Sequence, residues 1–196
     1  MNPTSKKKKT LSLFKTDLLR LDTLTIVRKH LLFGDTYSLP SDQYFELRRE
    51  VADGFEIHPS EVIMVGSGKI GFSIVPTKRY RPFSDTSDID LALLAPILFD
   101  EIWDQVYEFD HQKNFWPQAN QFKKYFFRGW IRPDLLPNSK LLPLGNRWFD
   151  FFRLLTNSRK YGGIKISAAL YKNWKFLESY QAICVNQCIE EIKAGK

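Results

Sequence analysis

The sequence VGSGKIGF at residues 65–72, followed by SDTSDIDL at residues 84–91, decides the fold of this chain. Residues 61–65 (EVIMV) are mostly apolar, rich in β-branched side chains and followed by Gly66, which is typical of a buried strand that enters a tight turn. The glycine-rich sequence predicts a short helix over residues 68–73, and DIDLALLA at residues 88–95 predicts a second strand. The expected order is therefore strand, turn, short helix, loop and strand.

Two carboxylates lie on one face of the second predicted strand. Asp88 and Asp90 point the same way, because successive side chains of a strand alternate between its faces. Paired carboxylates repel each other unless a divalent cation lies between them, and oxygen ligands favour Mg²⁺ or Mn²⁺ together with substrate phosphates. Upstream, Gly66, Ser67 and Lys69 offer backbone N–H groups, a hydroxyl and an ammonium group to a phosphate.

This order of motifs, Gly-Ser before a helix and Asp-x-Asp on the next strand, resembles the signature of the DNA polymerase β-like nucleotidyltransferase superfamily. The resemblance covers residues 61–95 and extends more weakly to a third strand. It implies a small mixed sheet of three or more strands, phosphate contacts from Gly66 and Ser67, and two Mg²⁺ or Mn²⁺ ions held by Asp88 and Asp90. It further implies a third acid on a later strand, which helps to activate the attacking hydroxyl.

The chain departs from that signature in its loop. Twenty residues, 68–87, separate Ser67 from Asp88, which implies an insertion around residues 75–82. The insertion carries Lys78, Arg79 and Arg81. These cations either bind the triphosphate or an acceptor backbone, or form a solvated basic loop.

The third acid is also missing from its expected strand. Residues 164–171 (IKISAALY) follow two glycines and predict a strand, but its polar positions are Lys165 and Ser167. Asp150 is the only acid between Asp134 and Glu178. It is either the catalytic acid or, since it lies in a helical pattern, half of an exposed ion pair with a neighbouring arginine.

The remaining pattern predicts an α+β fold with flanking helices and a helical C-terminal part. Helical spacing is found over residues 16–34, 41–54, 96–109, 117–131, 143–157 and 174–193. A length of 196 residues suits one domain. We expect a flexible basic N-terminus at residues 1–15 and a single domain at 16–196, with a core at 42–112, a basic helical part at 113–160 and a last strand and helix at 161–196.

The net charge of +7 is unevenly distributed. Residues 35–110 carry a net −9, whereas residues 111–176 carry +11. In the predicted helix at 117–131 and just beyond it, Lys124, Arg128 and Arg132 recur every four residues as one ridge. The ridge is either a solvated face or a phosphate-binding surface, and binding of nucleic acid there would weaken steeply with salt.

Other features bear on location and chemistry. The longest apolar run, residues 91–99, is too short to span a bilayer, so we expect no membrane insertion and a cytoplasmic protein. Cys184 and Cys188 lie four apart in a helical pattern and are expected to be buried apolar residues rather than a disulfide; a metal pair would need further ligands.

These observations predict a nucleotidyltransferase that moves a nucleoside monophosphate from an NTP or dNTP onto a hydroxyl of a nucleic acid, a nucleotide or a protein. Small free-standing members of the superfamily often serve antiviral defence or toxin–antitoxin systems, so the resemblance implies such a context. One alternative is a catalytically degenerate subunit that binds a nucleotide or a partner. Another is a basic nucleic-acid-binding subunit whose motif is coincidental.

Overall fold

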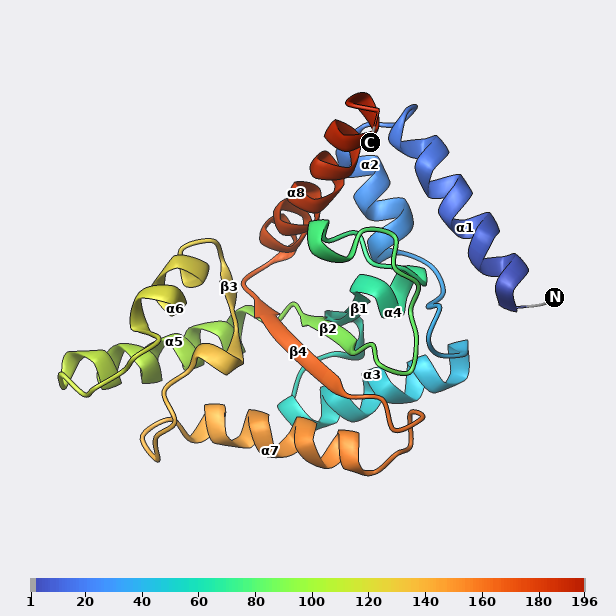
Figure 1. Cartoon of the computed structure of the whole chain (residues 1–196). Helices are drawn as coiled ribbons and strands as arrows, with labels where there is room; N and C mark the ends of the chain where they lie inside the picture. The colour runs from blue at the N-terminus through green and yellow to red at the C-terminus, as the bar shows by residue number, and fades with distance from the viewer. Residues whose placement is uncertain (1–2, 196) are drawn as a thin grey trace.

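A four-stranded mixed sheet forms the centre of the computed structural model, which describes residues 3–195, with side chains from residue 10 (Figure 1). Its strands are β1 (Val62–Val65), β2 (Ile89–Leu93), β3 (Trp130–Ile131) and β4 (Ile166–Tyr171), in the order β1-β2-β4-β3. The β1–β2 and β3–β4 pairs are antiparallel, whereas β2 and β4 are parallel. The expected α+β class is confirmed.

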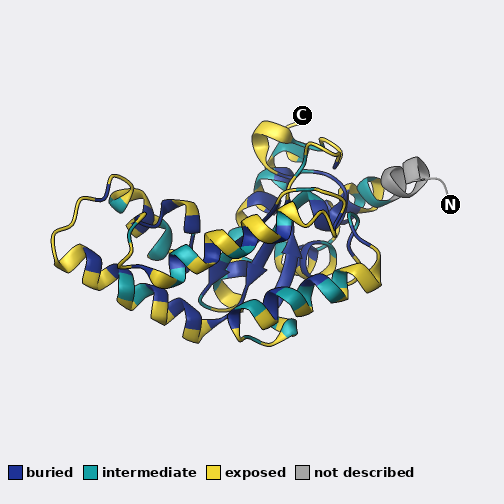
Figure 2. Cartoon of the chain, turned by 90° about the horizontal axis from the view of Figure 1, so that it is seen from below, coloured by how far each residue is buried: buried dark blue, intermediate teal, exposed yellow. Residues whose placement is uncertain are grey.

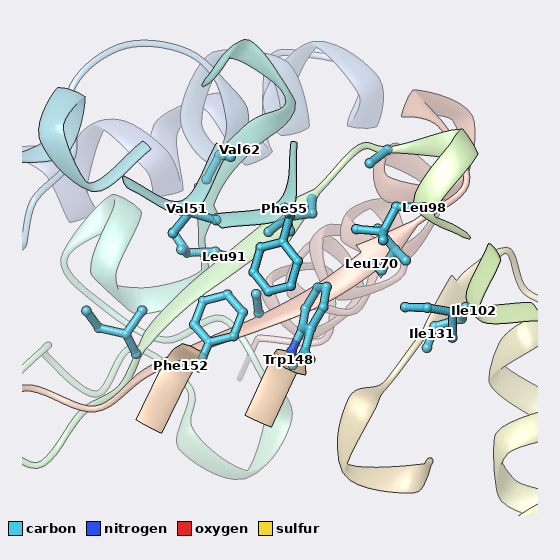
Figure 3. Close-up of a cluster of buried hydrophobic side chains, with 14 of the residues drawn as sticks. Val51, Phe55, Val62, Leu91, Leu98, Ile102, Ile131, Trp148, Phe152 and Leu170 are labelled. Atoms are coloured by element: carbon cyan, nitrogen blue, oxygen red, sulfur yellow. The ribbon is translucent and has the colours of Figure 1, made fainter. Parts of the chain in front are cut away.

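One face of the sheet packs against α3 (Ser41–Phe55), α5 (Pro96–His111) and α7 (Pro143–Asn157). Alternate residues of each strand enter this core, as the two-residue period of a strand requires. The Phe55 ring lies 4.8 Å from that of Trp148 and 5.7 Å from that of Phe152, so α3 and α7 meet beneath Leu91 and Leu170 (Figure 3). The helix α6 (Ala119–Phe126) joins the same core through Phe122.

The other face of the sheet packs against a second group of helices. These are α1 (Pro3–Leu18), α2 (Thr23–Ile26), the π-helical turn η1 (Val27–Leu32) and α8 (Trp174–Lys193). Helix α4 (Gly66–Ile70) and the 3-10 turns η2 (Pro59–Glu61), η3 (Pro76–Lys78) and η4 (Pro133–Leu135) complete the described elements. Figure 2 shows the strands buried between helices whose outer faces are exposed.

The N-terminal part differs from its prediction. Residues 3–18 form α1, which overlaps the segment 1–15 that we expect to be flexible, and Phe14 is fully buried. The helix expected over 16–34 is interrupted after Leu18, because Asp22 caps a new helix by accepting from the Thr25 N–H at 3.0 Å. Residues 1–2 of the expected flexible segment and residue 196 of the expected domain lie outside the described part of the chain.

The helix expected over 117–131 is also shorter, and its end creates β3. Helix α6 ends at Phe126, and Gly129 adopts a φ of +75°. A Cβ at position 129 would lie 2.1 Å from the Phe176 ring, so glycine is required both for the conformation and for the space. Arg132 therefore follows a strand, and the predicted ridge of Lys124, Arg128 and Arg132 does not form.

Across the described residues, no helix combines the length and the apolar character needed to cross a bilayer.

Candidate functional site

The turn at Gly66 lies directly against Asp90. Val65, the last residue of β1, pairs with Asp90 of β2, and Gly66 then turns the chain into α4 with a φ of +66°. A Cβ at position 66 would lie 3.2 Å from Oδ2 of Asp90. Glycine thus supplies the left-handed conformation and also leaves room for the carboxylate. The two motifs that the sequence separates by twenty residues meet at one point.

Asp90 is partly buried, and the side chain of Asp88 is 45% exposed. Ser167 Oγ donates a hydrogen bond to Asp90 Oδ1 at 3.1 Å. Burial raises the pKa of Asp90, and the charge of Asp88 raises it further, against the opposing hydrogen bond from Ser167. Lys165 Nζ lies 3.7 Å from Asp88 Oδ2, so β4 places an ammonium group beside the outer carboxylate. The charges of Lys165 and Lys78 lower the pKa of Asp90 and so offset part of the effect of burial and of Asp88.

Both carboxylates line a cavity of about 860 Å³, which also contains Gly66 and Ser67. This volume falls within the range of small-molecule sites. Cations from four parts of the chain line it as well, namely Lys78, Arg81, Arg132, Arg153 and Lys165. The cavity therefore combines two acids for a metal with a positively charged wall for an anion.

Three of these cations, Arg132, Arg153 and Lys165, were not identified from the sequence as part of the site. Arg132 was assigned to a helical ridge, but it follows β3 and bonds to Asp134 at 2.6 Å on the cavity wall. Arg153 lines the cavity from α7 while it pairs with Asp150 at 2.8 Å. The positive φ of Gly129, which no pattern of apolar residues reveals, decides the position of Arg132.

Among the residues that the structure describes, no third acid completes the pair formed by Asp88 and Asp90. Ser167 is the residue of β4 that pairs with Asp90, and Asp134 is bound to Arg132. Asp150 lies on the exposed side of α7 in its ion pair with Arg153, so we remove it from the candidate catalytic residues. The residues that the structure describes hold no group of three His, Cys, Asp or Glu side chains around one metal position.

Two of the predicted phosphate ligands serve the fold instead. Lys69 is 4% exposed, and its ammonium group donates to the Gly34 carbonyl, away from the cavity. Arg79 forms an ion pair with Glu191 of α8 at 2.6 Å and also donates to the Ile74 carbonyl. Of the three cations of the insertion, Lys78 and Arg81 line the cavity, together with Val75 and Pro82.

Replacing Lys69 with methionine is expected to remove a pH dependence of stability. Burial lowers the pKa of Lys69 from 10.5 to about 8, so the folded protein binds fewer protons than the unfolded chain between these values. The stability contributed by Lys69 is present above the unfolded pKa and is lost as the pH falls through about 8. Urea unfolding at pH 10 and at pH 7 gives the free energy of unfolding of both proteins. The value for Lys69→Met, relative to that of the wild type, should rise by up to about 3 kcal/mol as the pH falls from 10 to 7. A pH-independent difference would contradict this role.

The donor set fits a hard divalent cation. Mg²⁺ is commonly held by one or two carboxylates, with water and substrate phosphates completing its shell. Asp88 and Asp90 can supply the carboxylates, and a bound cation would offset the burial and the Asp88 charge that raise the pKa of Asp90. Lys165, which is 68% exposed, is free to move away from Asp88 when a cation binds.

Comparison with protein-family models, with curated proteins and with solved structures finds no match to this chain.

Proposed function

We propose that this protein is a metal-dependent nucleotidyltransferase that moves a nucleoside monophosphate from a nucleoside triphosphate onto a hydroxyl. The observation that carries the proposal is the meeting of Asp88 and Asp90 with the Gly66–Ser67 turn in one cation-lined cavity. Each motif alone is common in proteins. Their contact across twenty intervening residues supports a shared purpose.

The reaction forms a bond between the acceptor oxygen and the α-phosphorus and breaks the bond from that phosphorus to the bridging oxygen. Pyrophosphate leaves, and the hydroxyl proton passes to water. Bound Mg²⁺ would lower the pKa of the attacking hydroxyl and neutralise charge on the leaving group. Asp88 and Asp90 would hold the metal, while Gly66 and Ser67 would orient the phosphates through the N–H groups and hydroxyl of the turn.

The cavity cations suit the charge of a triphosphate. Lys78 and Arg81 extend from the insertion on one side, and Lys165 extends from β4 beside Asp88. In a partly desolvated cavity, such charges stabilise phosphate oxygens more strongly than they would in water. Lys165 would exchange Asp88 for a phosphate oxygen when the metal binds.

Arg132 and Arg153 support a phosphate-bearing acceptor, such as a nucleic acid. They lie on parts of the wall contributed by η4 and α7, away from the insertion, in the segment of the chain whose net charge is +11. Contacts of this kind are weakened strongly by salt, because binding releases counterions from the polyanion.

A second candidate function is nucleotide binding without transfer. It is favoured by one observation, the serine at position 167 in place of an acid beside Asp90. In that case the cavity would bind a metal–nucleotide complex and the protein would act as a binding subunit.

Release of pyrophosphate from each labelled NTP and dNTP, with and without nucleic acid, separates the two functions. We expect release that requires Mg²⁺ or Mn²⁺ and that decreases with salt when nucleic acid is the acceptor. Metal-dependent nucleotide binding without any release would select the second function. Failure to bind any triphosphate in the presence of metal would exclude both.

A further inference from the structure

Part of the cavity wall comes from β3, β4 and α8, through Trp130, Tyr171, Tyr180, Gln181 and Cys184. We call these five residues the aromatic recess. The Trp130 and Tyr171 rings are nearly parallel, with centroids 5.6 Å apart, and the Tyr180 ring lies 4.8 Å from that of Trp130. The recess thus offers aromatic walls to a planar ligand.

Gln181 is the unusual member of the aromatic recess. The residue is 6% exposed and lines the cavity; its amide forms no hydrogen bond to the residues whose side chains are described, and its polar atoms keep contact with the cavity. An amide that faces a cavity without a partner in the protein is left to bond to water or to a ligand there. It also carries one donor group and one acceptor, so it can pair with an edge that presents both. The amide therefore points to a polar ligand inside an otherwise apolar recess.

The aromatic recess adjoins the paired acids. Burial raises the pKa values of Tyr171 and Tyr180, and the charge of Asp90 is among the neighbouring charges that raise them further. Ser167, Ala169 and Tyr171 share one face of β4, and Ser167 bonds to Asp90. At about 3.3 Å per residue, this face runs about 13 Å from Ser167 to Tyr171. The interval leaves room for a pentose between a phosphate at Asp90 and a base in the recess.

We infer that the aromatic recess binds the base of the nucleoside triphosphate and that the Gln181 amide recognises adenine; this inference rests on the proposed function. Adenine presents an amino donor next to a ring-nitrogen acceptor, which an amide pairs with in a bidentate manner. It has no carbonyl oxygen, whereas guanine, cytosine and uracil each carry at least one, which the apolar walls would leave unpaired. The ring would lie against the aromatic walls.

Calorimetric titrations of the full-length protein with adenosine, with each of the four NTPs and with Mg²⁺-tripolyphosphate test this inference. The Gln181→Leu variant removes both the donor and the acceptor, and Gln187→Leu is a matched control on the same helix, outside the cavity. We expect Gln181→Leu to weaken adenosine and ATP binding about tenfold to a hundredfold and to abolish the preference for ATP. Tripolyphosphate binding and the control variant should be unchanged.

A second variant, Gln181→Glu, retains polarity and guards against a folding defect in Gln181→Leu. It loses the donor and places a carboxylate against the ring nitrogen, so adenosine binding should again fall at least tenfold. Equal binding of all four NTPs by the wild type, or unchanged adenosine binding in both variants, would overturn the inference while leaving pyrophosphate release intact. Gln181-dependent adenosine binding without pyrophosphate release would instead refute only nucleotidyl transfer.

Discussion

Replacing Asp90 with asparagine is expected to lower metal-dependent pyrophosphate release by roughly a hundredfold to a thousandfold. Asparagine has nearly the same shape and can still accept the hydrogen bond from Ser167, so the fold is retained. The variant loses the negative charge of the Asp90 side chain, which lies next to Gly66 inside the cation-lined cavity. Asp88→Asn should act in the same direction.

The same variant, Asp90→Asn, should be more stable than the wild type near pH 7, although it is less active. Because burial and Asp88 raise the folded-state pKa of Asp90, the folded protein binds more protons than the unfolded chain just above the ordinary carboxyl pKa. The stability contribution of Asp90 is therefore full at low pH and is lost as the pH rises through the folded pKa. In metal-free buffer near pH 7, Asp90→Asn should melt at a higher temperature than the wild type, and this gain should disappear near pH 4.

Asp150→Asn is the matched control for both measurements. Asp150 lies on the surface of α7 in an exposed ion pair, and such pairs contribute little to stability. Its replacement should leave the melting temperature nearly unchanged. The rate of pyrophosphate release should stay within about twofold of the wild-type rate. Release by Asp90→Asn at the wild-type rate, or a loss of release in Asp150→Asn, would contradict the assignment of the metal ligands.

The second large effect separates two arginines of the insertion. Arg79→Met should destabilise the protein by about 1–3 kcal/mol, because it leaves Glu191 without this guanidinium in a partly buried pair in which Glu191 is 36% exposed. The Ile74 carbonyl and the Cys188 sulfur lose the same donor. Arg81→Met should leave stability nearly unchanged and weaken Mg²⁺–triphosphate binding about tenfold or more, since Arg81 lines the cavity.

Urea unfolding and calorimetric titration of both variants give the two readouts. For Arg79→Met, nucleotide affinity is measured under conditions where the variant is fully folded. A large loss of affinity with unchanged stability in Arg79→Met would return that residue to the phosphate site. If Arg81→Met binds Mg²⁺–triphosphate with wild-type affinity, Arg81 does not belong to the phosphate site.

Much of the local structure could be predicted from the sequence. Helices α7 and α8 have the predicted bounds, Pro143–Asn157 and Trp174–Lys193, because each carries an apolar stripe of helical period and α7 has a proline at its start. β1, β2 and β4 follow from short apolar runs beside glycines or aspartates. The two-residue β3 and the π-helical η1 have no such pattern, because tertiary contacts rather than periodicity fix them.

The candidate site was predictable only where its residues are close in sequence. Gly66, Ser67, Asp88 and Asp90 form motifs, whereas Arg132 and Arg153 reach the cavity through long-range packing. Lys69 was misassigned because the turn of α4 directs it toward Gly34, which the motif alone does not reveal. One signal was available for Gln181: a single polar residue on the apolar stripe of α8.

That stripe consists of Leu177, Gln181, Cys184, Val185 and Cys188, which are all buried. A glutamine among four apolar residues either bonds to a buried partner or faces a ligand. The sequence shows the exception but not the cavity beside it. The parallel pairing of β2 and β4 places Ser167 beside Asp90. This pairing brings the aromatic recess close to the paired acids, and the sequence alone does not reveal it.

The central claim is that Asp88 and Asp90 hold a divalent metal against the phosphates of a nucleoside triphosphate. A crystal structure with Mn²⁺ and a non-hydrolysable triphosphate tests it most directly, through the anomalous scattering of the metal. We expect an anomalous peak coordinated by both aspartates and by a phosphate oxygen, with the phosphates against the Gly66–Ser67 turn. A triphosphate bound elsewhere, or no metal peak at the two aspartates at saturating Mn²⁺, would contradict it.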